Sequence, residues 1–105
     1  MFFELRQYQL KPGKRDEWVK FMDEVIIPYQ MSKGMVIPGS FVDEENDQYI
    51  WMRRFESEDE RKQQYEAVYE NDYWRNEIGP QVGEMIYREQ IQVKIIKATP
   101  HSYMQ

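Results

Sequence analysis

Charged and aromatic side chains recur at every second position in two segments of the sequence. The candidate site residues in these segments are Glu4, Arg6, Tyr8, Tyr49, Trp51 and Arg53. Side chains two positions apart on a strand point to the same face, so each segment presents its three side chains together. An arginine guanidinium holds a carboxylate or phosphate through paired hydrogen bonds, and aromatic rings flank a planar or apolar body. These residue types predict a pocket for a small anionic or aromatic organic molecule.

The same six side chains have a structural interpretation that involves no ligand. Glu4 would then pair with Arg6 or Arg53, because charged groups that a fold buries are usually neutralised by a partner. The residue pattern is compatible with both arrangements, so the ligand pocket and the buried ion pair both stay open at this point.

The composition excludes several kinds of chemistry. The chain has 105 residues and no cysteine, which rules out disulfides, thiolate metal sites and cysteine nucleophiles. The single histidine, His101, has no second histidine with which to hold zinc and no positioned acid partner that would activate Ser102. Haem would need His101 or a tyrosine as its axial ligand. We therefore expect neither a metal nor a cofactor.

Charge and hydropathy limit the partners. The net charge of −5, with basic and acidic residues interleaved, argues against nucleic-acid binding, which needs clustered lysine and arginine. No apolar run approaches the roughly 20 residues of a membrane-spanning helix, so membrane insertion is not expected. The first residues lack the order of a signal peptide and the composition of a transit peptide. These features predict a cytoplasmic protein.

The predicted elements that position the six residues form one domain over residues 1–105. Alternating or β-branched patterns predict strands at 2–10, 35–42, 48–55 and 91–95. Helical spacing predicts a helix over 14–27 that Pro28 interrupts, a helix opened by a capping box at Ser57, and a short helical piece that ends before Gly79-Pro80. The acidic segment 43–47 is predicted to be a solvated hairpin tip.

The element order predicts an α+β fold of ferredoxin-like βαββαβ topology, with one antiparallel sheet that carries its helices on one face. We assign the six candidate residues to the opposite face. Their rings would form an exposed apolar patch there, and such patches mark interaction surfaces. A second copy of the chain would cover the patch. The predicted assembly is thus a homodimer, with the ligand pocket between the two sheets.

Three segments closely resemble the NIPSNAP family, and in the same order. They are FELRQYQLKPG at 3–13, PGSFVDEENDQYIWMRRFES at 38–57 and QYEAVYENDYW at 64–74. The resemblance implies the dimeric α/β-barrel fold and says little about reaction. Other proteins of that fold oxidise, isomerise or decarboxylate small substrates without a metal. This implies an alternative function as a small cofactor-independent enzyme, monooxygenase- or isomerase-like, in which Glu4 or a tyrosine with a shifted pKa would be the acid or base.

Overall fold

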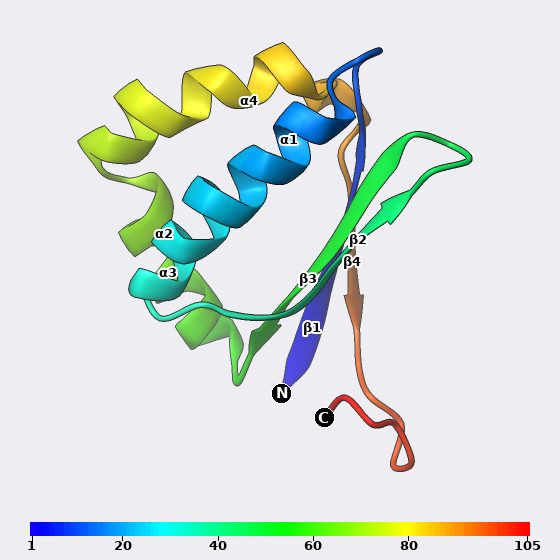
Figure 1. Ribbon diagram of the computed structural model, residues 1–105. Coiled ribbons are helices and arrows are strands. Elements are labelled where there is room, and N and C mark those ends of the chain that lie inside the picture. The colour runs from blue at the N-terminus through cyan, green and yellow to red at the C-terminus, as the bar shows by residue number, and fades with distance from the viewer.

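The sheet of this protein has four antiparallel strands, and all the helices lie against one of its faces (Figure 1). The structure, a computed structural model, describes residues 1–105. The strands are β1 (Phe2–Gln9), β2 (Val36–Asp43), β3 (Gln48–Phe55) and β4 (Gln92–Ile96), and they lie in the order β2-β3-β1-β4. This is the α+β, ferredoxin-like fold that the element order predicts.

The β2–β3 hairpin follows the prediction closely. The acidic segment forms its tip, where the Asp43 carboxylate accepts a hydrogen bond from the backbone N–H of Asn46 at 3.1 Å. The predicted irregularity around Pro38 is a register shift between Val36 and Gly39. Strand β2 tolerates this shift because it is an edge strand with only one neighbour.

The first helical segment does not end before Pro28. It continues through α1 (Arg15–Phe21), η1 (Met22–Ile26) and α2 (Ile27–Ser32), where η1 is a π-helical turn. Proline donates no hydrogen bond, and its ring clashes with the carbonyl four residues before it in an α-helix. The wider turn accommodates Pro28, because the N–H of Ile27 reaches back five residues to the carbonyl of Met22. Gly34, at φ 97°, ends the segment as predicted.

The second helical region repeats this pattern. It contains α3 (Glu58–Tyr69), η2 (Tyr73–Ile78) and α4 (Gly79–Met85), and the predicted end before Gly79-Pro80 is wrong. The N–H of Gly79 bonds to the carbonyl of Trp74, again five residues back, so the helix continues through Pro80. The predicted cap of α3 is confirmed, since Ser57 Oγ accepts from the N–H of Glu60 at 3.1 Å. A short turn, η3 (Arg88–Gln90), leads into β4.

The six candidate site residues lie on the helix-covered face, so their assignment to the opposite face is wrong. Glu4 pairs in register with Arg53, and Tyr8 pairs with Tyr49. Trp18 of α1 packs edge-on against both tyrosines, with ring centroids 5.9 and 6.1 Å apart. The large rings fill the space between the sheet and the helices. The charged pair is buried in the same layer because its charges neutralise each other there.

The face of the sheet opposite the helices carries a different apolar set. Its members come from all four strands and are paired in register: Phe3, Leu5, Phe41, Ile50, Met52 and Ile96. The C-terminal segment packs beside part of this face, where Arg54 donates to the carbonyl of Gln105 at 2.8 Å. None of the helices has the length and hydrophobicity that crossing a bilayer requires.

Candidate functional site

The carboxylate of Glu4 is the centre of a buried polar cluster. Its Oε1 accepts hydrogen bonds from Arg53 Nε at 3.0 Å, Arg53 Nη2 at 2.5 Å and Arg6 Nη1 at 3.1 Å. Its Oε2 accepts from Arg61 Nε at 2.9 Å and from the Tyr65 hydroxyl at 2.5 Å. The Glu4 and Arg53 side chains are fully buried, and that of Arg6 is 15% exposed. Glu4 is thus the one carboxylate that all three guanidiniums share, and only Arg61 has a second, the exposed Glu58 at 3.5 Å, so the buried part of the cluster is positively charged.

Three elements bring this cluster together. Strands β1 and β3 place Glu4 opposite Arg53. Helix α3 packs above them and presents Arg61, Tyr65 and Tyr69 at four-residue spacing, so all three side chains share one face of the helix. Sequence reasoning did not include Arg61 or the two tyrosines among the candidate site residues. The signal for Arg61 was its position one turn before Tyr65.

Glu4 is ionised over the whole physiological range. Burial alone would raise the pKa of its carboxyl group. The charge of Arg53, the hydrogen bond from Tyr65 and the charge of Arg6 outweigh burial and lower the pKa from 4.5 to about 2. A carboxyl group with this pKa does not hold a proton near neutral pH, so the expectation that Glu4 serves as a neutral-pH acid or base is wrong.

All the donor groups of Arg53 form hydrogen bonds within the protein. Besides Glu4, its Nη1 donates to Gln30 Oε1 at 3.1 Å and to the Tyr69 hydroxyl at 2.6 Å, while Nη2 donates to the Tyr65 hydroxyl at 2.8 Å. Its guanidinium carbon lies 5.1 Å from the centre of the Trp51 ring, within cation–π range. Every nitrogen of the guanidinium is engaged. Arg53 holds strands and helices together and has no donor group left for a ligand.

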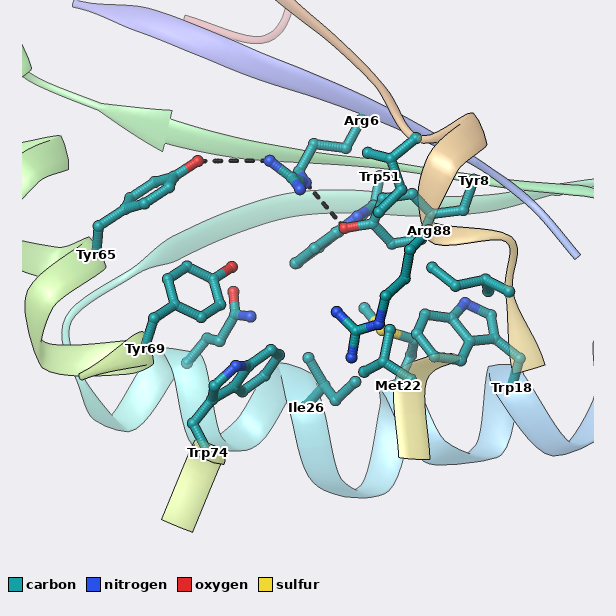
Figure 2. Close-up of a pocket in the computed structure, with 14 residues that line it drawn as sticks. Arg6, Tyr8, Trp18, Met22, Ile26, Trp51, Tyr65, Tyr69, Trp74 and Arg88 are labelled. Carbon is teal, nitrogen blue, oxygen red and sulfur yellow. Dashed lines mark hydrogen bonds between the residues drawn. The ribbon is translucent and has the colours of Figure 1, made fainter. Parts of the chain in front are cut away.

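A cavity of about 340 Å³ lies beside the polar cluster, between the sheet and the helices (Figure 2). This volume is within the range of small-molecule sites. The 14 residues that line it are Arg6, Tyr8, Trp18, Met22, Ile26, Gln30, Trp51, Tyr65, Tyr69, Trp74, Val82, Ile86, Arg88 and Ile91. The walls are thus mainly aromatic and aliphatic, and both π-helical turns contribute to them.

The structure divides the six predicted residues into three groups. Arg6, Tyr8 and Trp51 line the cavity. Glu4 and Arg53 lie behind its wall in the ion pair that the structural interpretation anticipates. Tyr49 is buried in the core and does not line the cavity.

Two guanidiniums reach the cavity without a full set of partners. Figure 2 shows Arg6 between the hydroxyls of Tyr8 and Tyr65, which accept from it at 2.8 and 3.4 Å. Arg88 extends into the same cavity and donates to the backbone carbonyl of Gly79, and it forms no ion pair with a carboxylate. Sequence reasoning missed Arg88. It lies in a turn, and the residues next to it in the sequence do not indicate that its side chain points into the fold.

Comparison with known proteins agrees with the fold. The sequence model of the NIPSNAP family matches residues 3–103. A NIPSNAP family protein from Agrobacterium tumefaciens is 25% identical, with a TM-score of 0.86 over 99% of this chain and 98% of that one. An uncharacterised NIPSNAP domain protein from Burkholderia xenovorans is 14% identical, with a TM-score of 0.83 over 97% and 98%. An antibiotic biosynthesis monooxygenase, 14% identical over 95% of this chain and 100% of that one, shares the fold with a TM-score of 0.66. No curated protein matches the chain.

Proposed function

The chain belongs to the NIPSNAP family, and from this premise we propose that it binds a small organic anion with an aromatic or apolar body. The proposed site is the cavity between the sheet and the helices. This differs from the site expected between two sheets, because the candidate side chains face the helices.

The position of Arg6 supports the proposal most directly. Its side chain is only 15% exposed, and its guanidinium shares its only carboxylate partner with Arg53 and Arg61. A buried positive charge is costly unless an anion neutralises it. Arg88 adds a second charge to the same cavity. An anionic group beside Arg6 and Arg88 would therefore lower the free energy of the site.

The residues that line the cavity indicate the chemistry of the uncharged part of the ligand. All three tryptophans of the chain, Trp18, Trp51 and Trp74, line the cavity. Their rings, together with aliphatic side chains, favour a planar or apolar body. A benzoate- or cinnamate-like acid combines the two features.

The enzymatic alternative has less support in this cavity. Glu4, the predicted acid or base, is ionised with a pKa of about 2 and is held by arginines. Burial raises the pKa of Tyr8 and of Tyr65, which keeps both hydroxyls protonated at neutral pH. These groups can donate hydrogen bonds to a ligand, but they are poorly suited to removing a proton from it.

Tryptophan fluorescence tests the proposal directly, because every tryptophan reports on the cavity. We expect trans-cinnamate to quench the fluorescence saturably, and the uncharged trans-cinnamamide to bind about tenfold more weakly or not at all. Replacing Arg88 by Ala should weaken cinnamate binding without unfolding the protein, because the Arg88 side chain makes only one hydrogen bond to the protein.

A matched control is Arg75→Ala, which removes an exposed arginine from η2, outside the cavity. Equal affinity for the acid and the amide, or equal effects of the two arginine substitutions, would refute an anion site. Native mass spectrometry of protein purified from its own host would show whether a bound acid accompanies it.

We also propose that the chain is a homodimer that packs through the face of the sheet opposite the helices. Apolar side chains from all four strands lie on this face, and Phe41 is 54% and Ile96 37% exposed. A second copy is the occupant that fits, because a two-fold axis can place this apolar face against itself. The family resemblance implies the same arrangement.

The oligomeric state of two variants tests the dimer. Phe41→Lys introduces a charge on the face of the sheet opposite the helices. This variant should be a monomer in size-exclusion chromatography with light scattering. Met31→Lys places the same charge on α2, at a side chain that is 56% exposed, and should leave the dimer intact. A wild-type monomer would refute this proposal without affecting the cavity.

A further inference from the structure

We infer that the cavity is an oxyanion site, which binds the ionised form of a carboxylic acid, enol or phenol in preference to its neutral form. This inference rests on the proposed function, since it specifies the chemistry of the ligand in that same cavity. It specifies which protonation state of the ligand is bound, and it therefore predicts that binding lowers the pKa of the ligand.

The polar groups on the cavity wall are almost all hydrogen-bond donors. No aspartate, glutamate or histidine is among the lining residues. The charged lining residues are Arg6 and Arg88, and a guanidinium donates but cannot accept. A ligand that enters must therefore supply acceptors. The nearest carboxylate, Glu4, is saturated by three arginines and Tyr65.

Tyr8 has its hydroxyl proton available for a ligand. Its oxygen accepts a hydrogen bond from Arg6 Nε at 2.8 Å, and Arg6 cannot accept one in return. The Tyr8 hydroxyl donates to no protein group, although the side chain is buried and lines the cavity. The guanidinium thus orients the phenol so that it serves as a donor.

Tyr69 repeats this arrangement from the opposite layer of the fold. Its oxygen accepts from Arg53 Nη1 at 2.6 Å, and its own proton likewise has no protein acceptor. Figure 2 shows the hydroxyls of Tyr8 and Tyr69 both directed into the space that Arg6 and Arg88 enter. Two arginines therefore fix two phenolic donors beside two cationic donors.

The buried indoles add to the excess of donors. The N–H groups of Trp18 and Trp51 are buried and have no partner, and both rings line the cavity. Unpaired buried donors are rare in native proteins and cost free energy. The two N–H atoms are covered by neighbouring side chains, so they add unpaired donors to the layer around the cavity, while the ligand contacts are assigned to the arginines and tyrosines.

Such a wall discriminates between protonation states. A neutral acid carries an O–H donor, and the side-chain acceptors on the wall already accept from arginines: Gln30, Tyr65 and Tyr69 from Arg53, and Tyr8 from Arg6. The ionised form offers lone pairs alone, and hydrogen bonds to a charged acceptor are stronger than those to a neutral one. The titratable groups around the ligand, which are Arg6, Arg88, Tyr8, Tyr65 and Tyr69, include none that would carry a negative charge at neutral pH.

The binding of 4-nitrophenol tests this inference, because its phenol ionises near neutral pH and only the phenolate absorbs visible light. We expect the apparent pKa of the bound dye to fall by about one to two units relative to the free dye. This equals phenolate binding that is about ten- to a hundredfold tighter than binding of the phenol. Tyr8→Phe and Tyr69→Phe should each reduce that preference by about five- to tenfold, through loss of one charge-assisted hydrogen bond.

Tyr103→Phe is the matched control, because Tyr103 is fully exposed in the C-terminal segment. Circular dichroism checks that each variant is folded, and Tyr69→Phe provides an independent measurement if Tyr8→Phe unfolds. Dye that binds with an unshifted or raised pKa would overturn the oxyanion site while leaving small-molecule binding intact. Failure of both nitrophenol and cinnamate to bind would overturn the proposed function and this inference together.

Discussion

Arg53 Nε lies 3.0 Å from Oε1 of Glu4, its cross-strand partner on β1, and neither side chain is exposed to solvent. Loss of one member of such a pair leaves the other charged and desolvated, which costs more than the intact pair contributes. The stability of the sheet at this point therefore depends on keeping both members.

Replacing Glu4 by Gln should destabilise the protein by about 3–5 kcal/mol, because Arg53 would stay buried without its counter-charge. Urea unfolding followed by tryptophan fluorescence measures this change. The control is Glu58→Gln, since Glu58 has a 71% exposed side chain 3.5 Å from Arg61 and should contribute less than about 1 kcal/mol. Similar losses in the two variants would mean that the Glu4 cluster is solvated.

The free energy of unfolding should decrease at acidic pH as Glu4 becomes protonated. Its pKa is about 2 in the folded protein and 4.5 in the reference state, so the unfolded chain binds more protons between these values. The stabilisation is complete above pH 4.5 and is lost as the pH falls toward 2, by about 3 kcal/mol in total. Carboxyl NMR measures the titration directly. A Glu4 midpoint near 4.5 would contradict the ion-pair geometry.

Gly79 should not tolerate a side chain. A Cβ at this buried position would lie 2.9 Å from the backbone carbonyl oxygen of Trp74, which the π-helical turn holds in place. We expect Gly79→Ala to lower the free energy of unfolding by about 1–3 kcal/mol, as overpacking does.

The control for this substitution is Gly83→Ala in the same helix. Its Cβ would approach Arg88 Nε at 3.1 Å, and that long side chain can move. Gly83→Ala should therefore be neutral, or stabilising by up to about 1 kcal/mol through helix propensity. If both variants were equally stable in urea, the close approach at Gly79 would not constrain the turn.

Ser57→Ala should remove the cap of α3. The Ser57 hydroxyl accepts from the N–H of Glu60 at 3.1 Å, and loss of such a cap costs about 1 kcal/mol. The comparison with Ser57→Asp separates capping from other effects, because Asp can accept the same hydrogen bond and also favours the positive end of the helix dipole. Thermal unfolding should rank Asp at or above Ser, with Ala lowest.

The strands could be predicted from sequence because alternation is a local property. The pattern over Gln48 to Phe55 gives the observed bounds of β3, and the capping box at Ser57 gives the observed start of α3. The helix ends could not be predicted at Pro28 and Pro80. Proline stops an α-helix, but a π-helical turn before it removes the clash, and no sequence signal announced that turn.

The face of the sheet that meets the helices could not be predicted either. Alternation shows that Tyr8 and Leu5 point to opposite sides, but not which side the helices cover. The deciding factor is the fit between layers, in which Trp18 packs against Tyr8 and Tyr49. For the site, prediction found Arg6, Tyr8 and Trp51 but not Arg88, whose place depends on how the chain turns after α4.

Strand β1 contributes alternate residues to two different surfaces of the sheet. Its even-numbered positions, Glu4, Arg6 and Tyr8, supply the polar cluster and the cavity, while odd-numbered positions such as Phe3 and Leu5 supply the outer face of the sheet. Substitutions can therefore change the residues on one face of the strand without affecting those on the other. A single inserted or deleted residue within the strand would exchange the two faces, so that the charged side chains point outward and the apolar side chains inward. Natural variation in β1 should accordingly consist of replacements and almost never of changes in its length.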